Sequence, residues 1–440
     1  MDILSSSRLM FWLMILGLVA AYPAQGELLF RMHGSNTVGA ALGPALAKHY
    51  LRKELGAGNV HYRPDSVPRQ GWIVGELPDG RGEVAIEIHA HGSSTAFRDL
   101  RAGLADVGMA SRPIKAKEVT ALKPLGSFTG PQAEYVIGLD GIAVIVPRNN
   151  RIKSLTVAQL AAVFSGRIRS WRELGINMGR IAVYARDDNS GTYDTFKHLV
   201  LGKKLKLTGS ARRYESNAEL SDDVSRDPQA IGFVGLPYIR NSRAVTIAVT
   251  KGAARYPSVF NVATEDYALS RRLFMYAAPR TQNRDVEKFL AFALSDSGQK
   301  VVRQTGFVSQ NIEALDMQVS KVYPREYRDF VKNARRLSVN FRFKKGSLEL
   351  DSRAYRDLER VAKYIQQHPE VNELMLFGFS EDASIPIHNI SLSEARADKV
   401  ENELRKRGIT VHHIRGYGAY GSVADNKEKE KNRRVEVWVR

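Results

Sequence analysis

Residues 84–104 read VAIEIHAHGSSTAFRDLRAGL, and they set the pattern for most of the chain. Apolar and polar residues alternate over the first eight positions, which is typical of a strand. Gly92 then opens a run of hydroxyl residues, after which Phe97, Leu100 and Leu104 recur at helical spacing. The stretch predicts a strand, a polar loop and an amphipathic helix in succession.

The same succession occurs twice more in the larger part of the chain. One strand pattern leads into GSNT at 34–37, and another leads into RDDNSGT at 186–192. Because short strands alternate with helical patterns over residues 27–315, we expect an α/β domain with a largely parallel sheet.

Each of the three loops places hydroxyl groups before a helix. Unpaired backbone N–H groups and the positive end of the helix dipole favour an anion there. A single serine or threonine at such a position is most often only a helix cap. Three such loops in one domain, one of them carrying Arg186, favour a shared oxyanion site, because arginine can bind an oxyanion through two N–H groups. The sequence lacks a Gly-Lys-Ser or Gly-Lys-Thr phosphate loop, so we do not expect nucleotide hydrolysis.

The C-terminal part of the chain follows a different pattern. Residues 316–333 are charged and weakly periodic, and we interpret them as a linker. In residues 334–440, the alternation of LSVNFRF predicts a half-buried strand, and a helix, a strand, a helix and a closing strand follow. This is a small β-α-β-α-β unit.

The N-terminus has the features of a signal peptide. Arg8 precedes an apolar run that ends at Tyr22, and Pro23 and small residues follow, so residues 1–26 are expected to be cleaved before Glu27. A membrane anchor is the alternative, but the run is shorter than the ~20 residues needed to span a bilayer. We therefore expect an exported chain that does not span the membrane.

The amino-acid composition limits the kinds of partner and ligand that the chain can bind. The chain has no cysteine, which excludes disulfides, thiolate metal sites and a lipid-attachment cysteine. The net charge is +18 and the pI about 9.9, which favours anionic partners. The basic residues are scattered and form no nucleic-acid-binding motif, so nucleic acid is not expected. No HExxH motif or clustered His/Asp spacing predicts a metal site, and no cofactor is expected.

Residues 27–315 resemble the phosphate-binding protein of bacterial phosphate transporters (PstS-like). The resemblance implies a two-lobed type II periplasmic-binding-protein fold that closes over an anion, and an inner-membrane ABC permease as a partner. The matching motifs are GSNTVG, GSSTAFRDLRAGLADVGMASRPI, VIGLDGIAVIVP, SLTVAQLAAVFSGRIRSWRELG, ARDDNSGTYDTF and AIGFVGLPYI.

The resemblance also implies which residues line the anion. Asp188 is expected to orient the arginine. The implied oxyanion-binding residues are Ser35, Asn36 through its backbone, Thr37, Ser93, Ser111, Arg186, Ser190, Gly191 and Thr192.

Ser111 departs from the family pattern. It stands where the phosphate binders have a carboxylate that accepts a proton from phosphate, and Arg112 follows it. A site of donors without that acceptor tolerates a fully ionised dianion. Phosphate is the expected ligand, with sulfate and arsenate as alternatives, and Asp140 or Asp187 is a candidate for the missing acceptor. An ordinary loop turn before Pro113 is the other interpretation of Ser111 and Arg112.

Arg396 lies on an otherwise apolar stripe of the last helix, spaced by four from Leu392 and Val400. Such a cation either extends to the edge of the stripe or faces an anion. Glu381 and Asp382 lie in the loop before this helix. A cation and a carboxylate together suit a zwitterion, such as the free amino-acid end of diaminopimelate in a wall peptide.

Residues 334–440 resemble the OmpA-like peptidoglycan-binding domain. The motif appears as GFSEDASIPIHNISLSEARADKV, followed by RGYGAYGSVADN and NRRVEVWV. The resemblance implies that Arg396 holds the diaminopimelate carboxylate, with Asn389 at a matching position. Glu381 stands where the family has an aspartate, and Asp382 is an alternative candidate for that role. Ser384 replaces a glycine of the family motif. Arg433 and Arg434 belong to the last motif.

These features predict a non-catalytic receptor for phosphate or a related oxyanion, tethered to peptidoglycan in the periplasm and associated with the outer membrane. The alternatives are a phosphatase and a structural or adhesive envelope protein. The sequence offers no serine with evident histidine and aspartate partners, which argues against an enzyme. Transport, storage, sensing and scavenging are all compatible with the sequence.

Overall fold

The computed structural model describes residues 26–440 apart from five short gaps, at 189, 250–253, 345–346, 382–385 and 425–428. Except for its last residue, the predicted signal peptide lies outside this part of the chain. Among the described residues, no helix is both long enough and apolar enough to cross a membrane.

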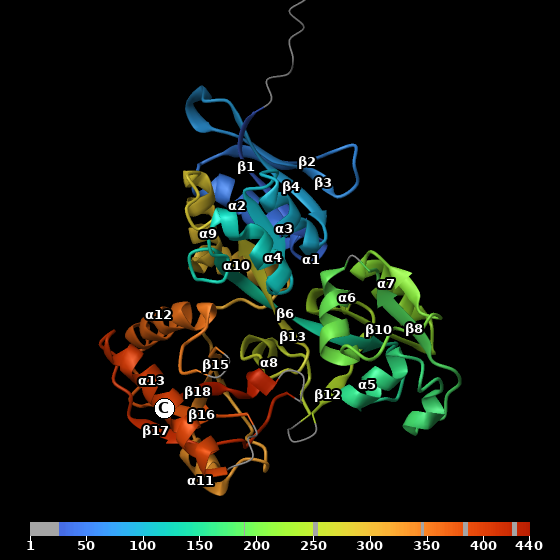
Figure 1. The fold of residues 1–440 in the computed structure, drawn as a ribbon, viewed down its shortest axis with the longest axis vertical. Coiled ribbons are helices and arrows are strands. Elements are labelled where there is room, and N and C mark those ends of the chain that lie inside the picture. Colours follow the sequence, from blue (N-terminus) through green and yellow to red (C-terminus); the bar gives the residue numbers. More distant parts are fainter. Residues whose placement is uncertain (1–25, 189, 250–253, 345–346, 382–385, 425–428) are drawn as a thin grey trace, which may run out of the picture.

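Two lobes share one continuous sheet (Figure 1). In the described part of the chain, this sheet has eleven strands: ten follow the order β2-β3-β4-β1-β5-β13-β6-β10-β8-β9, and the eleventh, β11, pairs with β6. β1 runs parallel to β4 and β5, and β10 runs parallel to β8. The bounds are β1 Glu27–Ser35, β2 Gly58–Pro64, β3 Gln70–Glu76, β4 Glu83–His91, β5 Val107–Ala110, β6 Glu134–Val146, β8 Ala182–Arg186, β9 Arg212–Tyr214, β10 Ala230–Gly235, β11 Arg243–Ala244 and β13 Ser270–Tyr276.

The pair β6 and β13 connects the lobes, and we call it the hinge pair. β6 first pairs with β13, from Glu134 to Gly141, and its last residues pair with β10. Lobe 1 holds β1 to β5, and lobe 2 holds β8 to β10 (Figure 1). A small second sheet in lobe 2 pairs β7 Ser154–Thr156 with β12 Thr246–Ala248.

Helices cover both lobes, and each lobe has its own apolar core. Phe30 and Phe289 lie in the core of lobe 1, and Phe164 and Phe233 in that of lobe 2. This two-lobed α/β architecture confirms the predicted fold class. The helices of lobe 1 are α1 Asn36–Gly39, α2 Leu42–Lys53, α3 Ser93–Arg101, α4 Ala116–Leu122, α9 Arg284–Leu294 and α10 Asp296–Gln304; those of lobe 2 are α5 Val157–Phe164, α6 Gly191–Phe196, α7 Asn217–Arg226 and α8 Val259–Ala263.

The C-terminal domain is a sheet covered by two helices. The strand order is β14-β15-β18-β16-β17. The predicted β-α-β-α-β unit is present, and β14 and β17 extend its sheet. The bounds are β14 Ala314–Asp316, β15 Arg335–Arg342, α12 Ser352–Gln367, β16 Leu374–Phe379, α13 Pro386–Arg405, β17 His413–Gly416 and β18 Arg434–Val439.

The predicted linker is instead packed structure. β14 pairs with β15 at its start, and helix α11 Arg325–Phe330 follows. Tyr323 and Tyr327 are buried against Phe377, Phe379 and Trp438. The linker prediction is wrong because tyrosines that look isolated in the sequence cover the outer face of the C-terminal sheet.

The C-terminal domain docks on the chain segment that leads into β13. Asp266 accepts a hydrogen bond from Arg336 at 2.7 Å, and Glu265 pairs with Arg272 at 2.7 Å and lies 3.5 Å from Arg342. Burial raises the pKa of these two carboxyl groups, but the surrounding arginines outweigh it and lower the pKa of both. The contact is therefore a buried network of charged groups.

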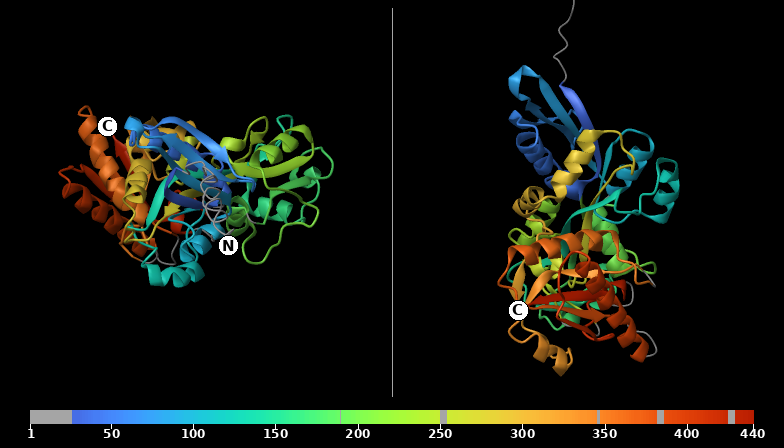
Figure 2. Two further views of the ribbon diagram at one scale, coloured as in Figure 1. Left: turned by 90° about the horizontal axis from the view of Figure 1, so that it is seen from above. Right: turned by 90° about the vertical axis from the view of Figure 1, so that its left-hand side faces the viewer.

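A second contact joins the C-terminal domain to lobe 1. Arg356 of α12 donates hydrogen bonds to the carbonyls of Glu134 and Pro131, at 3.2 and 2.5 Å. Lobe 2 and the C-terminal domain lie on opposite sides of lobe 1 when viewed from above (Figure 2). The domain is therefore held against the hinge pair rather than separated from it by a flexible segment.

Candidate oxyanion and wall-peptide sites

Hydroxyl groups from both lobes meet at the interface between them. Ser35 at the end of β1 donates a hydrogen bond to Ser111, which follows β5, at 3.2 Å. Ser93 at the start of α3 lies 3.4 Å from the same Ser111 hydroxyl. Across the interface, Thr37 and Thr192 are hydrogen-bonded at 3.2 Å. We call this group of residues the cradle.

Helix capping explains the position of Ser190 but not that of Ser35. Ser190 accepts hydrogen bonds from the backbone N–H groups of Thr192 and Tyr193, so it caps α6. Ser35 and Ser93 make no side-chain capping bond to their helices and instead contact Ser111. The side chain of Asn36 donates to the Ala90 carbonyl, at 3.2 Å.

Gly191 allows the two lobes to approach closely. A Cβ atom at this position would lie 2.1 Å from the Ser111 hydroxyl and 2.7 Å from that of Ser93. Such distances are too short for any side chain. The backbone of α6 therefore lies directly against the hydroxyls of lobe 1.

Arg186 lies at the end of β8, and 1% of its surface is exposed. Its guanidinium donates to the carbonyls of Tyr214 and Glu215, at 3.2 and 2.5 Å. Nη1 is buried, and it has no hydrogen-bond partner among the described residues. Burial lowers the pKa of Arg186 to about 10, although the nearby Asp187 raises it. Arg186 is thus a buried, charged donor.

Arg271 is a cradle residue that the sequence analysis did not identify. It comes from β13, and it donates to Thr192 at 2.9 Å and to Asp140 at 2.6 Å. Its Nη1 is also buried without a partner in the described structure. The only sequence signal was a pair of arginines in an apolar strand. Asp140, a candidate acceptor, is occupied by Arg271 and by the Leu236 N–H.

The structure places Asp187, Asp188 and Arg112 where they do not fill the roles expected from the sequence. Asp188 pairs with Arg213 at 2.8 Å, so the carbonyls, and not Asp188, hold Arg186. Asp187 lies 3.9 Å from Arg186. Arg112 pairs with Glu118 at 2.7 Å, away from Ser111. Ser111 itself lies at the centre of the cradle rather than in an ordinary turn.

Two ion pairs bridge the lobes. Lys115 of lobe 1 lies 3.2 Å from Asp194 of lobe 2. Arg69 and Glu215 form a second pair across the interface. The described conformation is therefore a closed one.

The C-terminal domain also holds, at a predicted site, a buried arginine with nitrogens that lack partners among the described residues. Arg396 of α13 is 1% exposed and lies over the Phe343 ring, 5.5 Å from its centroid. Its Nε and Nη1 are buried and lack hydrogen-bond partners in the described part of the chain. Burial and the neighbouring Arg433 together lower its pKa to about 10, and Glu381 opposes this shift.

Glu381 and Arg433 complete this second site, which we call the Arg396 pocket. The two form an ion pair at 3.2 Å, and Glu381 is about one-third exposed. Asn389 is buried at the start of the same helix. Asp382 and Ser384 lie outside the described residues. The pocket thus presents an exposed carboxylate beside two buried cations.

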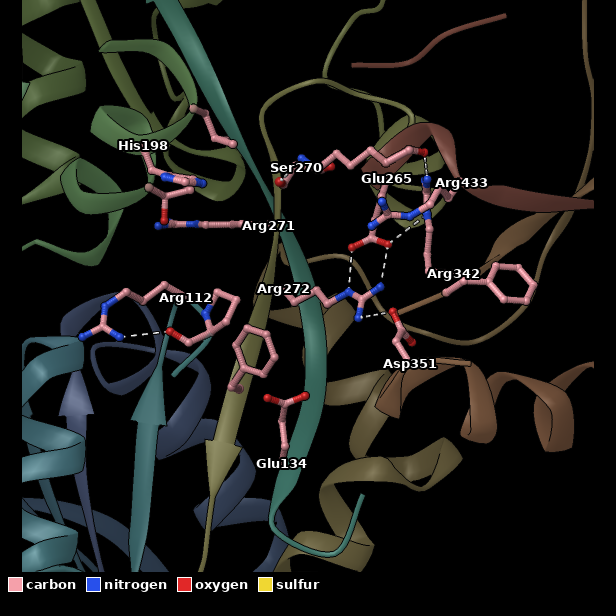
Figure 3. Close-up of a pocket in the computed structure, with 16 residues that line it drawn as sticks. Arg112, Glu134, His198, Glu265, Ser270, Arg271, Arg272, Arg342, Asp351 and Arg433 are labelled. Carbon is pink, nitrogen blue, oxygen red and sulfur yellow. Dashed lines mark hydrogen bonds and ion pairs between the residues drawn. The ribbon is translucent and has the colours of Figure 1, made fainter. Parts of the chain in front are cut away.

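A cavity of about 360 Å³ separates the two sites (Figure 3). Its wall includes Arg112 and Arg271 near the cradle, and Arg433 and Phe343 near the Arg396 pocket. Arg272 crosses the middle of the cavity wall and pairs with Glu265 and Asp351 (Figure 3). The side of the C-terminal domain that carries the Arg396 pocket therefore faces the hinge pair.

Comparison with known proteins matches each domain separately. A model of a PBP superfamily domain matches residues 81–297, and a model of the OmpA family matches residues 342–436. Protein SphX of Synechococcus elongatus is 31% identical over 248 residues, which cover 54% of this chain and 72% of that protein.

Two further proteins show similarity to the same part of the chain. The phosphate-binding protein PstS of Staphylococcus aureus is 31% identical over 237 residues, covering 52% of this chain and 70% of that protein. A solved ABC-type phosphate transport receptor from Vibrio cholerae is 24% identical with a TM-score of 0.49, covering 63% of this chain and 99% of that one.

Proposed function

The chain belongs to the family of PstS phosphate-binding proteins and ends in an OmpA family domain, and from this premise we propose that it is a periplasmic oxyanion receptor held on peptidoglycan. Like its phosphate-binding relatives, the protein is a binding protein and not an enzyme. Phosphate is the proposed ligand, and the cradle is its proposed site.

One observation carries the oxyanion assignment: hydroxyl groups from both lobes meet beside the buried Arg271, and the buried Arg186 lies close enough to Arg271 to interact with it electrostatically. Thr37 and Thr192 face each other at 3.2 Å across the lobes, and Arg186 and Arg271 each keep a buried N–H group without a partner in the described chain. A buried unpaired donor costs about 1–3 kcal/mol, more when charged. An oxyanion between these groups would satisfy both arginines.

The proposed ligand residues follow from this arrangement. Arg271 joins them because it touches Thr192 and comes from the hinge pair, which would connect anion binding to lobe closure. The full set is Ser35, Asn36 through its backbone, Thr37, Ser93, Ser111, Arg186, Ser190, Gly191, Thr192 and Arg271.

The proposed selectivity rests on Ser111. Among the described residues around it, its neighbours are other hydroxyls, and Asp140 is already paired with Arg271. A cradle of donors accepts phosphate, arsenate and the fully ionised sulfate. We therefore propose weaker discrimination against sulfate than a carboxylate at this position would provide.

The wall attachment is proposed for the Arg396 pocket. Arg396 would bind the carboxylate of diaminopimelate, Glu381 its ammonium group, and Asn389 would lie beside them. Support comes from the unpartnered nitrogens of Arg396 and from the partly exposed carboxylate of Glu381. Such a protein would reside in the periplasm, on the wall beneath the outer membrane.

Calorimetry with the purified chain tests the receptor proposal. We expect one phosphate per chain, with measurable heat for arsenate and sulfate as well. Absence of heat with all three anions would refute it. Co-sedimentation with isolated sacculi tests the attachment independently, and recovery of the chain only in the supernatant would contradict it. A permease partner is tested by phosphate uptake in cells that lack and regain the chain.

A further inference from the structure

Lobe 1 holds a cluster of histidines and carboxylates outside the cradle. His33 lies on β1, opposite His89 on β4, and Glu87 lies two residues before His89 on the same face. One ligand atom from each of these three side chains lies within 4.8 Å of the other two. The histidine rings are stacked, with centroids 3.9 Å apart.

Hydrogen bonding leaves room for a cation in this cluster. His33 faces a carboxylate oxygen at each ring nitrogen, Asp99 at 3.0 Å from Nδ1 and Glu87 at 2.8 Å from Nε2. A neutral imidazole has only one N–H group. The second nitrogen and its carboxylate therefore need a cation between them, either a second proton or a metal ion.

The surroundings orient His33 as they do in known metal sites. A metal-binding histidine usually donates its other N–H to a carboxylate, which fixes the ring. Asp99 of α3 is 5% exposed and lies at Nδ1 of His33. Its other oxygen accepts a hydrogen bond from Arg98 at 2.7 Å, which holds the carboxylate in place.

The distances between the ligand atoms suit a divalent ion. Zinc binds histidine nitrogen and carboxylate oxygen at about 2.0–2.2 Å, so its ligand atoms lie about 3.3 Å apart in a tetrahedral site. Glu87 lies 2.8 Å from Nε2 of His33 and 3.5 Å from Nε2 of His89. Glu87 and Asp99 together offer two negative charges. A cavity of about 440 Å³ adjoins the cluster and leaves space for a water as fourth ligand.

We propose that His33, Glu87 and His89 form a Zn²⁺ site in lobe 1, with Asp99 as a positioning residue for His33. Binding requires the stacked rings to turn toward a common point. β1 and α3, which carry His33 and Asp99, also carry Ser35 and Ser93 of the cradle. A bound ion would join β1 to β4 directly, and would reach α3 only through the hydrogen bond between His33 and Asp99. We expected no metal site from the sequence because His33 lies 54 or more positions before Glu87 and His89.

Zinc titration of the full chain, without a histidine tag and in phosphate-free buffer, tests the site. Competition with a chromogenic chelator is expected to show one tightly held Zn²⁺ per chain. Glu87→Gln and His89→Ala should each weaken binding at least about tenfold, and Asp99→Asn about 10–100-fold. Co²⁺ should give the visible absorption of a low-coordinate site, which His89→Ala abolishes.

His61→Ala is the matched control, because His61 is an exposed histidine of β2 that bonds the Asn59 carbonyl. It should bind zinc like the unmodified chain. Phosphate binding and the melting temperature of each variant show whether it is folded. Absence of one-to-one zinc uptake, or uptake that the Glu87 and His89 variants leave unchanged, would overturn the proposal.

Discussion

The cradle and the Arg396 pocket each contain a buried arginine with unsatisfied N–H groups, yet their surroundings differ. Arg186 is held by two backbone carbonyls, and neutral hydroxyls face the same interface. Arg396 lies over an aromatic ring, and a carboxylate paired with Arg433 lies at the edge of its pocket. In the proposed function, the arginine would supply the anion affinity in both sites, and its neighbours would determine the class of ligand: an oxyanion in the first, a zwitterion in the second.

Removing Arg186 should have the largest effect. Arg186→Ala takes a buried charge away from the proposed anion, and loss of one partner of such a pair costs about 2–5 kcal/mol. We expect phosphate affinity to fall at least about thirtyfold in calorimetry. Arg226→Ala, an exposed arginine in the same lobe, should bind normally. Unchanged phosphate affinity in Arg186→Ala would show that this arginine does not bind the anion.

Removing Arg396 should abolish wall binding without affecting the cradle. Arg396→Met keeps an apolar chain over Phe343 while deleting the charge, so the fold should persist. We expect loss of sacculus co-sedimentation and an unchanged phosphate Kd. Arg405→Ala, an exposed arginine of the same helix, is the control. A parallel loss of phosphate binding would mean that the two sites are not independent.

A carboxylate at Ser111 would sharpen the difference between the sites. Ser111→Asp places an acceptor among the cradle hydroxyls, and like charges in close contact cost several kcal/mol. Sulfate affinity should fall more than phosphate affinity, by about tenfold or more in competition calorimetry. Asparagine has the same size as aspartate but no charge, so Ser111→Asn should leave the ratio of sulfate affinity to phosphate affinity unchanged. Equal losses for both anions would contradict the proposed role of Ser111.

Glu381→Asp should have the smallest effect. The shorter carboxylate keeps the charge beside Arg433, and partly exposed ion pairs contribute only about 0.2–1 kcal/mol. Sacculus binding should be preserved or slightly strengthened, whereas Glu381→Gln should weaken it. If both variants bind equally, the pocket recognises a carboxylate alone and not a zwitterion.

Local sequence patterns were enough to predict many of the strands and helices. Alternation in LSVNFRF predicted β15, and its residues Leu337, Val339 and Phe341 are buried. The strand–loop–helix successions predicted the elements that carry Ser35, Ser93 and Ser190. The hydroxyls of Ser35 and Ser93 both lie close to that of Ser111, at 3.2 and 3.4 Å, because parallel strands bring their carboxyl ends to one edge of a sheet.

The sequence by itself therefore determined the two modules and the loops at their sites, because periodicity and capping act over a few residues. Only the tertiary structure decided three other features: Arg271 beside Thr192, the packing of residues 316–333 with the C-terminal sheet, and the meeting of His33, Glu87 and His89. Each depends on residues far apart in the chain. Their side chains meet only when the sheet and its neighbouring domain are assembled, so no local pattern records the contact.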